Sequence, residues 1–121
     1  MKVRNQYFLV SDLDEAWEFY PLLLGPGVRK PGRLVFSPPG AEFQFYSLTP
    51  EQLTRYGFSS RAGEPWSGTC LESPDWERRL DQLQAAGARL LTPWEPLAWG
   101  GGHGCQLADP SGHRWELISS D

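Results

Sequence analysis

The chain has 121 residues, a net charge of −4, 40% hydrophobic and 21% charged residues, and two cysteines. These values predict one folded domain over residues 1–121 and exclude a disordered chain or a disulfide scaffold. The negative charge argues against nucleic acid as a partner, because phosphate contacts need clustered Lys and Arg. With no signal peptide and no membrane-spanning apolar run, a cytoplasmic protein with reduced, buried Cys70 and Cys105 and no membrane partner is expected.

The first half begins with a strand and a helix. Residues 7–10 are apolar and predict a short strand. Ser11 is suited to cap the helix that follows, and Gly25 is suited to end it. The expected apolar stripe of this helix is Leu13, Trp17, Tyr20 and Leu24.

The second half repeats this order. Residues 69–71 predict a strand, Ser73 the cap of a helix, and Pro74 its first residue. The stripe of this helix has the same spacing as the first: Trp76, Leu80, Leu83 and Gly87.

The ends of the two halves also match. When residues 37–47 are aligned with residues 109–119, the Pro and the Gly of a tight turn coincide, and Gln44 aligns with Glu116. The chain is therefore predicted to be an α+β protein of two βαβββ modules, about residues 1–47 and 66–121. The linker, 48–65, holds a short helix that a capping box from Thr49 to Gln52 opens and Gly57 ends.

The last strand raises a question about one carboxylate. Alternation places Trp115 and Leu117 on one face of the strand and Arg114, Glu116 and Ile118 on the other. Glu116 therefore lies either in solvent or in a cavity.

These motifs resemble the vicinal oxygen chelate superfamily, also called the glyoxalase/bleomycin-resistance/dioxygenase proteins. The matching stretches are residues 10–13, Phe19-Tyr20 with Leu24-Gly25, residues 85–88, and residues 109–117. The resemblance covers nearly the whole chain. It implies two modules whose curved sheets form an open, cup-like barrel, and usually a homodimer, in which some members exchange modules between chains.

The resemblance also implies four metal-ligand positions in the family's enzymes, one on the first and one on the last strand of each module. Here they fall on Asn5, Gly68, Gln44 and Glu116. Only Glu116 is the residue that those enzymes use. Neutral amides are weak ligands for Mg²⁺, Mn²⁺ or Fe²⁺ and glycine has no side chain, so no metal and no other cofactor is expected. A zinc set of Cys70, His103, Cys105 and Glu116 is an alternative that the spacing does not demand.

The cup implied by the family would hold polar side chains under an aromatic rim. Phe58, Trp66, Trp94 and Trp99 are expected at the rim, where aromatic or cationic compounds stack between such rings in the family's antibiotic-binding members. The candidate ligand-binding residues are Asn5, Tyr7, Glu42, Gln44, Tyr46, Trp66, Trp99, His103, Arg114 and Glu116.

Residues 100–104 are rich in glycine. A phosphate loop needs a helix after it, whereas a strand follows here, so that interpretation is rejected. A mobile flap beside Trp99, carrying His103, is expected instead. His113, directly after the turn glycine, is expected to stabilise the turn.

The departures from the metal positions favour a binding protein over an enzyme. The expected function is to bind or sequester a small aromatic or cationic compound, such as an antibiotic, without metal. Glu116 is then either a polar anchor for the ligand or a structural residue of the cup. The alternatives are a metal-dependent lyase, isomerase or dioxygenase with diverged ligands, in which Glu116 would be catalytic, and a domain whose site has decayed.

Overall fold

A computed structural model describes residues 1–2, 5–47, 49–56 and 69–121. The chain divides into two compact units, Met1–Ala62 and Gly63–Asp121. No helix among the described residues is long and apolar enough to cross a membrane.

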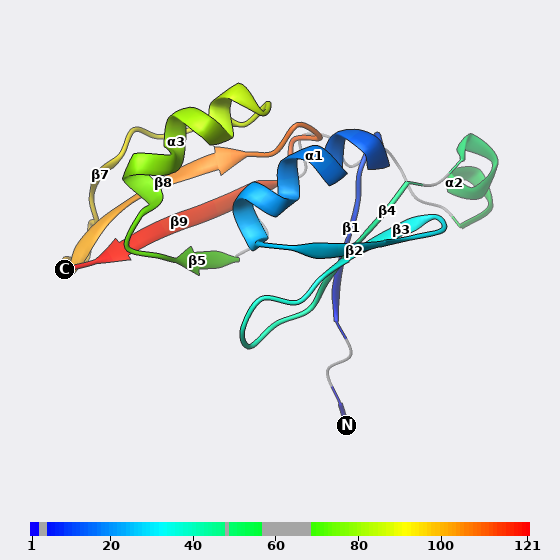
Figure 1. Ribbon diagram of the computed structural model, residues 1–121, viewed down its shortest axis with the longest axis horizontal. Coiled ribbons are helices and arrows are strands. Elements are labelled where there is room, and N and C mark those ends of the chain that lie inside the picture. Colours follow the sequence, from blue (N-terminus) through cyan, green and yellow to red (C-terminus); the bar gives the residue numbers. More distant parts are fainter. Residues whose placement is uncertain (3–4, 48, 57–68) are drawn as a thin grey trace. The chain divides into compact units, whose positions relative to one another are not determined.

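The first unit is a four-stranded sheet with one helix packed against it (Figure 1). Its elements are β1 (Gln6–Leu9), α1 (Leu13–Leu24), β2 (Gly27–Lys30), β3 (Arg33–Phe36) and β4 (Phe43–Tyr46), followed by α2 (Pro50–Tyr56). The strand order is β1-β4-β3-β2, with β1 parallel to β4 and the other pairs antiparallel.

Aromatic side chains form the core between this sheet and α1. The Phe45 ring is stacked on Phe8, lies 4.0 Å from the Tyr20 ring between centroids, and meets Phe36 edge-on. Full burial of a ring of this size stabilises a fold by about 1.5–3 kcal/mol. These contacts place Phe8 and Phe45 on the core face of β1 and β4.

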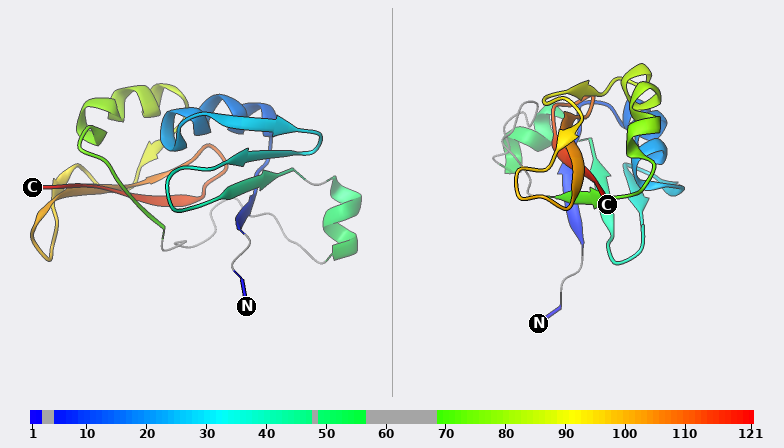
Figure 2. Two further views of the ribbon diagram at one scale, coloured as in Figure 1. Left: turned by 60° about the horizontal axis from the view of Figure 1, so that its bottom comes forward. Right: turned by 90° about the vertical axis from the view of Figure 1, so that its left-hand side faces the viewer.

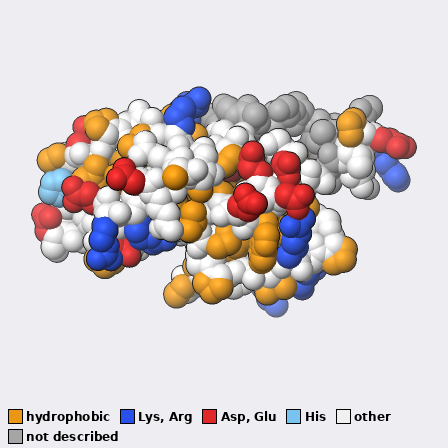
Figure 3. Space-filling view, turned by 45° about the horizontal axis from the view of Figure 1, so that its top comes forward, with side chains coloured by type: hydrophobic (Ala, Val, Ile, Leu, Met, Phe, Trp, Pro, Cys, Tyr) orange, Lys and Arg blue, Asp and Glu red, His pale blue; other side chains and the backbone are white. Residues whose placement is uncertain are grey.

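Helix α1 begins one residue later than the sequence predicts. Asp12, not Ser11, is the N-cap, and its Oδ1 accepts hydrogen bonds from the backbone N–H groups of Asp14 and Glu15, at 2.8 and 3.3 Å. Gly25 ends the helix at φ 85°, as predicted. The buried stripe is Ala16, Phe19, Tyr20, Leu23 and Leu24, which is rotated from the expected one. The opposite side of α1 is acidic, and its carboxylates gather on the surface shown in Figure 3.

The second unit repeats the first topology with one additional strand. Its elements are β5 (Cys70–Glu72), α3 (Trp76–Ala85), β6 (Arg89–Leu90), β7 (Glu95–Pro96), β8 (Gly102–Ala108) and β9 (Arg114–Ser120). The order β5-β9-β8-β6 matches that of the first unit, and β7 pairs with β8 (Figure 2). The predicted βαβββ order is therefore confirmed in both halves of the chain.

Two local predictions in the second unit are wrong. Helix α3 starts at Trp76 with Asp75 as the N-cap residue, so Ser73 and Pro74 lie before the helix. The Ser73 hydroxyl instead donates to the Asp75 carboxylate, and this bond, more than the charges of Arg79 and Arg78, lowers the pKa of Asp75. Cys70 is exposed on the edge strand β5, whereas Cys105 is buried as expected.

The turn before β9 is held by a buried carboxylate. Asp109 Oδ1 accepts hydrogen bonds from the N–H groups of Ser111 and His113, at 2.9 and 2.7 Å, and Gly112 has φ 95°. The His113 carbonyl also accepts a hydrogen bond from the Asp109 N–H. The predicted turn is confirmed, His113 takes part in it through its backbone N–H and carbonyl, and Asp109 supplies the side-chain acceptor.

A pocket over the Glu116 face of the second unit

Glu116 lies in a row of side chains that crosses three strands. It is paired in register with Cys70 on β5 and with Gln106 on β8. Directly opposite residues of paired strands project to the same side of a sheet. These three residues therefore share one side, here called the Glu116 face. Alternation places the buried Trp115 and Leu117 on the other side, where α3 packs against β9.

The Glu116 carboxylate changes the acidity of both cysteines. Although Cys70 is exposed as a residue, its thiol is partly desolvated, and this desolvation, hydrogen bonding to Glu116 and the charges of Glu116 and Glu72 raise its pKa to about 11. The pKa of Cys105 is raised to about 11 by burial and by the charge of Glu116. Neither thiol is a nucleophile near neutral pH, because the thiolate is the reactive form.

The segment before β8 folds back over the Glu116 face. Thr92 accepts a hydrogen bond from the Gln106 N–H through its Oγ1, at 2.8 Å, and the Gln106 carbonyl accepts from Leu91, also at 2.8 Å. Gly104 has no side chain, and a Cβ there would lie 2.9 Å from Leu97 Cδ2. The glycine therefore allows Leu97 to pack directly onto the sheet.

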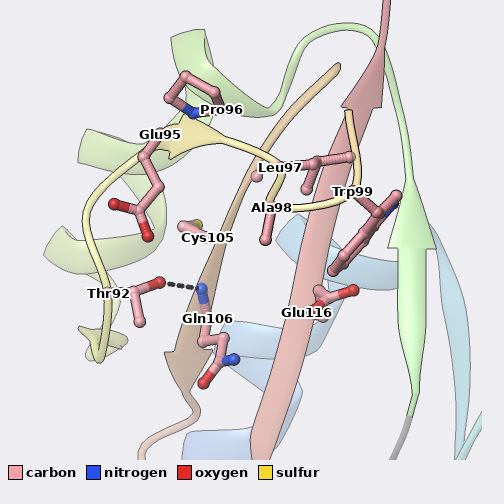
Figure 4. Close-up of a pocket in the computed structure, with 10 residues that line it drawn as sticks. Thr92, Glu95, Pro96, Leu97, Ala98, Trp99, Cys105, Gln106 and Glu116 are labelled. Carbon is pink, nitrogen blue, oxygen red and sulfur yellow. Dashed lines mark hydrogen bonds between the residues drawn. The ribbon is translucent and has the colours of Figure 1, made fainter. Parts of the chain in front are cut away.

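A pocket of about 160 Å³ lies under this segment. Its walls are Thr92, Glu95, Pro96, Leu97, Ala98, Trp99, Gly104, Cys105, Gln106 and Glu116. Figure 4 shows the carboxylates of Glu95 and Glu116 at opposite sides of the pocket, with the Trp99 ring over Glu116. Within this unit, Glu116 is therefore half-buried and faces a pocket.

The glycine-rich stretch is the turn of a β-hairpin. The Leu97 N–H donates to the Gly102 carbonyl at 2.9 Å, the Gly100 N–H donates to the Leu97 carbonyl at 3.0 Å, and β7 pairs with β8. The glycines at positive φ build the reversal between these two paired strands, and the mobility expected of this flap stays a prediction.

His103 lies away from the pocket. It is paired with Ser119, on the face opposite Gln106 and Glu116, and its Nδ1 is 3.9 Å from Asp121 Oδ1.

Arg114 lies on the Glu116 face two residues before Glu116, is exposed, and is not among the pocket walls. Trp94 is half-buried outside the pocket walls, and the predicted Phe58 and Trp66 lie outside the described residues.

The first unit has its own polar row, on β4. The Gln44 amide donates to Glu42 Oε2 at 3.2 Å, and the Tyr46 hydroxyl donates to Gln44 Oε1. Tyr7, opposite Gln44 in register, meets the Tyr46 ring edge-on at 6.2 Å. Four of the predicted ligand residues are thereby brought together, and Asn5 lies half-buried just before β1.

The residues at the family's metal positions do not fit a divalent ion. Gln44 is a neutral amide whose carbonyl oxygen accepts from Tyr46, and Glu116 is the one anionic residue among the four positions. Gly68 carries no donor and lies outside the described residues. Within the described parts of the chain, no three His, Cys, Asp or Glu side chains are grouped to hold a metal, so the zinc alternative is not assembled there.

The pocket also contains residues that sequence reasoning missed. Glu95, Gln106 and Thr92 were not among the candidates, although they form much of its polar lining. Alternation along residues 102–108 would have assigned Gln106 to the Glu116 face. No local pattern signals that residues 92–99 return to that face.

Solved structures with the same fold come from several kinds of protein. A hypothetical protein from S. aureus is 14% identical, with a TM-score of 0.82 over 98% of this chain and 94% of that chain. The fosfomycin resistance protein FosX from Listeria monocytogenes, solved as a mutant with Mn(II), is 12% identical, with a TM-score of 0.70 over 99% and 90%. A bleomycin-binding protein complexed with bleomycin is 21% identical, with a TM-score of 0.64 over 100% of both chains. At these identities the likeness shows the fold.

A family model identifies the chain more directly. No curated protein matches its sequence significantly. The model described as Glyoxalase/Bleomycin resistance protein/Dioxygenase superfamily, however, matches residues 5–117. The protein therefore belongs to the glyoxalase/bleomycin resistance protein/dioxygenase superfamily, as the resemblance of its motifs predicted.

Proposed function

We propose that this protein binds and sequesters a small aromatic or cationic compound, such as an antibiotic, without a metal ion and without chemical turnover. The observation that carries this proposal is the pocket over the Glu116 face, which a half-buried carboxylate and an exposed tryptophan both line. Pockets that combine apolar walls with a few polar groups are typical of small-molecule sites. The likeness in fold to a bleomycin-binding protein is consistent with this class of function.

The absence of a second catalytic group supports binding rather than chemistry. General acid–base catalysis or nucleophilic attack needs a titratable group matched to its task. Among the described residues that line the pocket, the titratable groups besides Glu116 are the carboxylate of Glu95 and a Cys105 thiol whose raised pKa keeps it protonated. We further propose that the protein acts as a cytoplasmic homodimer, which sedimentation analysis at micromolar concentration would test.

The proposal is tested by screening aromatic and cationic antibiotics against chelator-treated protein. Binding is followed by tryptophan fluorescence and by the thermal unfolding midpoint. The expected result is saturable binding of at least one compound, which is recovered unchanged after incubation and binds equally well with and without chelator. Binding of none of the compounds, or conversion of a bound compound, would overturn the proposal.

One observation favours a second candidate function. Glu116 is retained at a position where the family's metal enzymes carry a glutamate, so a metal-dependent lyase, isomerase or dioxygenase with diverged ligands is the alternative. That function requires a divalent ion to raise the unfolding midpoint in a concentration-dependent way. It also requires Glu116→Gln to abolish that effect.

A further inference from the structure

We propose that the pocket of the second unit takes the cationic end of an organic ligand, an ammonium or amidinium group, and that it rejects anions. This inference depends on the proposed binding function and specifies its ligand class. It is drawn from the charge of the pocket walls, the exposure of Trp99 and the size of the pocket.

The charge of the walls is one-sided. The ten lining residues include two carboxylates, Glu95 and Glu116, and no lysine, arginine or histidine. Within the described part of the chain, no ion pair neutralises either carboxylate. Arg114, the nearest basic residue along β9, lies outside the walls and makes other interactions.

Glu116 can still accept hydrogen bonds from a ligand. An ionised carboxylate has about four lone-pair sites. The Cys70 thiol, a weak donor, occupies at most one of these sites, and the carboxylate lies at the wall of the pocket. A charged N–H donor from a ligand would form the shorter, stronger type of hydrogen bond that ionised partners make.

Trp99 adds an aromatic surface at the same place. Its side chain is 69% exposed, which is far more than packing requires of so large an apolar residue. Figure 4 shows its ring over Glu116, so a cation held by that carboxylate would also lie near the ring. Cation–π attraction would then act together with the carboxylate, and a ligand ring could stack on the indole.

The size of the pocket limits what enters it. Its volume of about 160 Å³ is below the roughly 300–1,000 Å³ of pockets that enclose drug-sized molecules. One aromatic ring with a short amine arm is therefore the expected size of the part that this pocket encloses. A phosphonate or carboxylate of the same size would be placed between two like charges and is expected to be excluded.

A charge series of small probes tests this inference. Benzylamine, benzyl alcohol and phenylphosphonate share one ring and differ in charge. Titration followed by tryptophan fluorescence should give saturable millimolar binding of benzylamine, binding of the alcohol about tenfold weaker, and no binding of the phosphonate. Equal binding of amine and alcohol, preference for the phosphonate, or no binding of the amine would each overturn it.

Matched variants locate the effect. Glu116→Gln and Glu95→Gln should each weaken benzylamine binding by about five- to tenfold and leave benzyl alcohol binding unchanged. Glu77→Gln, on the exposed side of α3, makes the same change in net charge outside the pocket and should change neither. Equal losses in Glu77→Gln would mean that net charge, and not the pocket, attracts the amine.

The two proposals fail in different ways. If the antibiotic screen finds a ligand but the charge series shows no preference for the amine, the cation class is wrong and the binding function stands. If neither the screen nor the series detects binding, both proposals are wrong.

Discussion

Cys70 on β5 and Glu116 on β9 are register partners, and the Glu116 carboxylate helps to raise the pKa of the Cys70 thiol. The pair joins an edge-strand cysteine to the wall of the pocket. Its properties can be measured without knowledge of the ligand.

Replacing Glu116 should make Cys70 more reactive. Glu116→Gln removes the negative charge beside the thiol, so the pKa of Cys70 should fall from about 11 toward its ordinary value of 9.0. Because the thiolate is the nucleophile, alkylation by iodoacetamide at pH 8 should become several-fold faster. Peptide mass spectrometry separates Cys70 from the buried Cys105. Glu72→Gln is the matched control and should have a smaller effect, since the Glu72 charge is the weakest of the causes; an unchanged rate in Glu116→Gln would contradict the pairing.

Stability should fall in alkaline solution because of Cys105. Its pKa is about 11 in the folded protein against 9.0 for an ordinary thiol, so folding favours the protonated form. The resulting stabilisation is complete below pH 9 and is lost as the pH rises from 9 to 11. At 3% exposure of Cys105, this loss amounts to at most about 2–3 kcal/mol.

Urea denaturation of wild type and Cys105→Ala across that pH range measures the loss. Subtracting the two curves removes the contribution of the lysines and tyrosines, which titrate in both proteins. A difference that does not change with pH would show that Cys105 is not in the environment described.

Removing the Asp109 carboxylate should destabilise the hairpin formed by β8 and β9. Asp109 is 4% exposed and accepts two backbone N–H groups. Asp109→Ala leaves those donors buried without this acceptor and should lower the free energy of unfolding by about 2–3 kcal/mol. Asp109→Asn keeps an acceptor oxygen and should lose less. Urea denaturation gives both values, and equal stability of the alanine variant and wild type would refute this role.

Trp99 should contribute to binding and not to folding. Trp99→Ala should weaken binding of a ligand found in the screen at least several-fold through lost stacking, with little change in the thermal midpoint, because the side chain is 69% exposed. Trp94→Ala is the informative control. Trp94 is half-buried and not among the pocket walls, so its removal should lower the midpoint and leave affinity unchanged. If Trp94→Ala weakened binding and Trp99→Ala did not, the ligand would have to bind at a different site.

Features set by nearby residues could be predicted from the sequence. The capping box is present as expected, with Thr49 and Gln52 exchanging hydrogen bonds of 2.9 and 3.1 Å. The turn at Gly112 and the two faces of β4 follow from the same local rules. The repeated strand order follows from the internal repeat, because equivalent patterns fold into equivalent topologies.

Features set by tertiary pairing could not be predicted. From the sequence, His103 is expected in a loop. Only the pairing of β7 and β8 and the register of β8 with β9 show that it lies on the face of the sheet away from Glu116. Cys70 looks like a core residue until β5 is known to be an edge strand. Ser73 competes with Asp75 for the start of α3, and the ion pairs of Asp75 with Arg78 and Arg79 favour the later start.

We propose that the protein binds its ligand without a metal ion. The most direct measurement is metal analysis by plasma mass spectrometry on protein purified without chelator and without an affinity tag. Divalent metal far below one equivalent per chain is the predicted result, since Asn5 and Gln44 are neutral amides and Gly68 has no side chain, which leaves Glu116 as the one anionic residue at the four family positions. Near-stoichiometric metal that is lost in Glu116→Gln would contradict the account and identify Glu116 as a ligand.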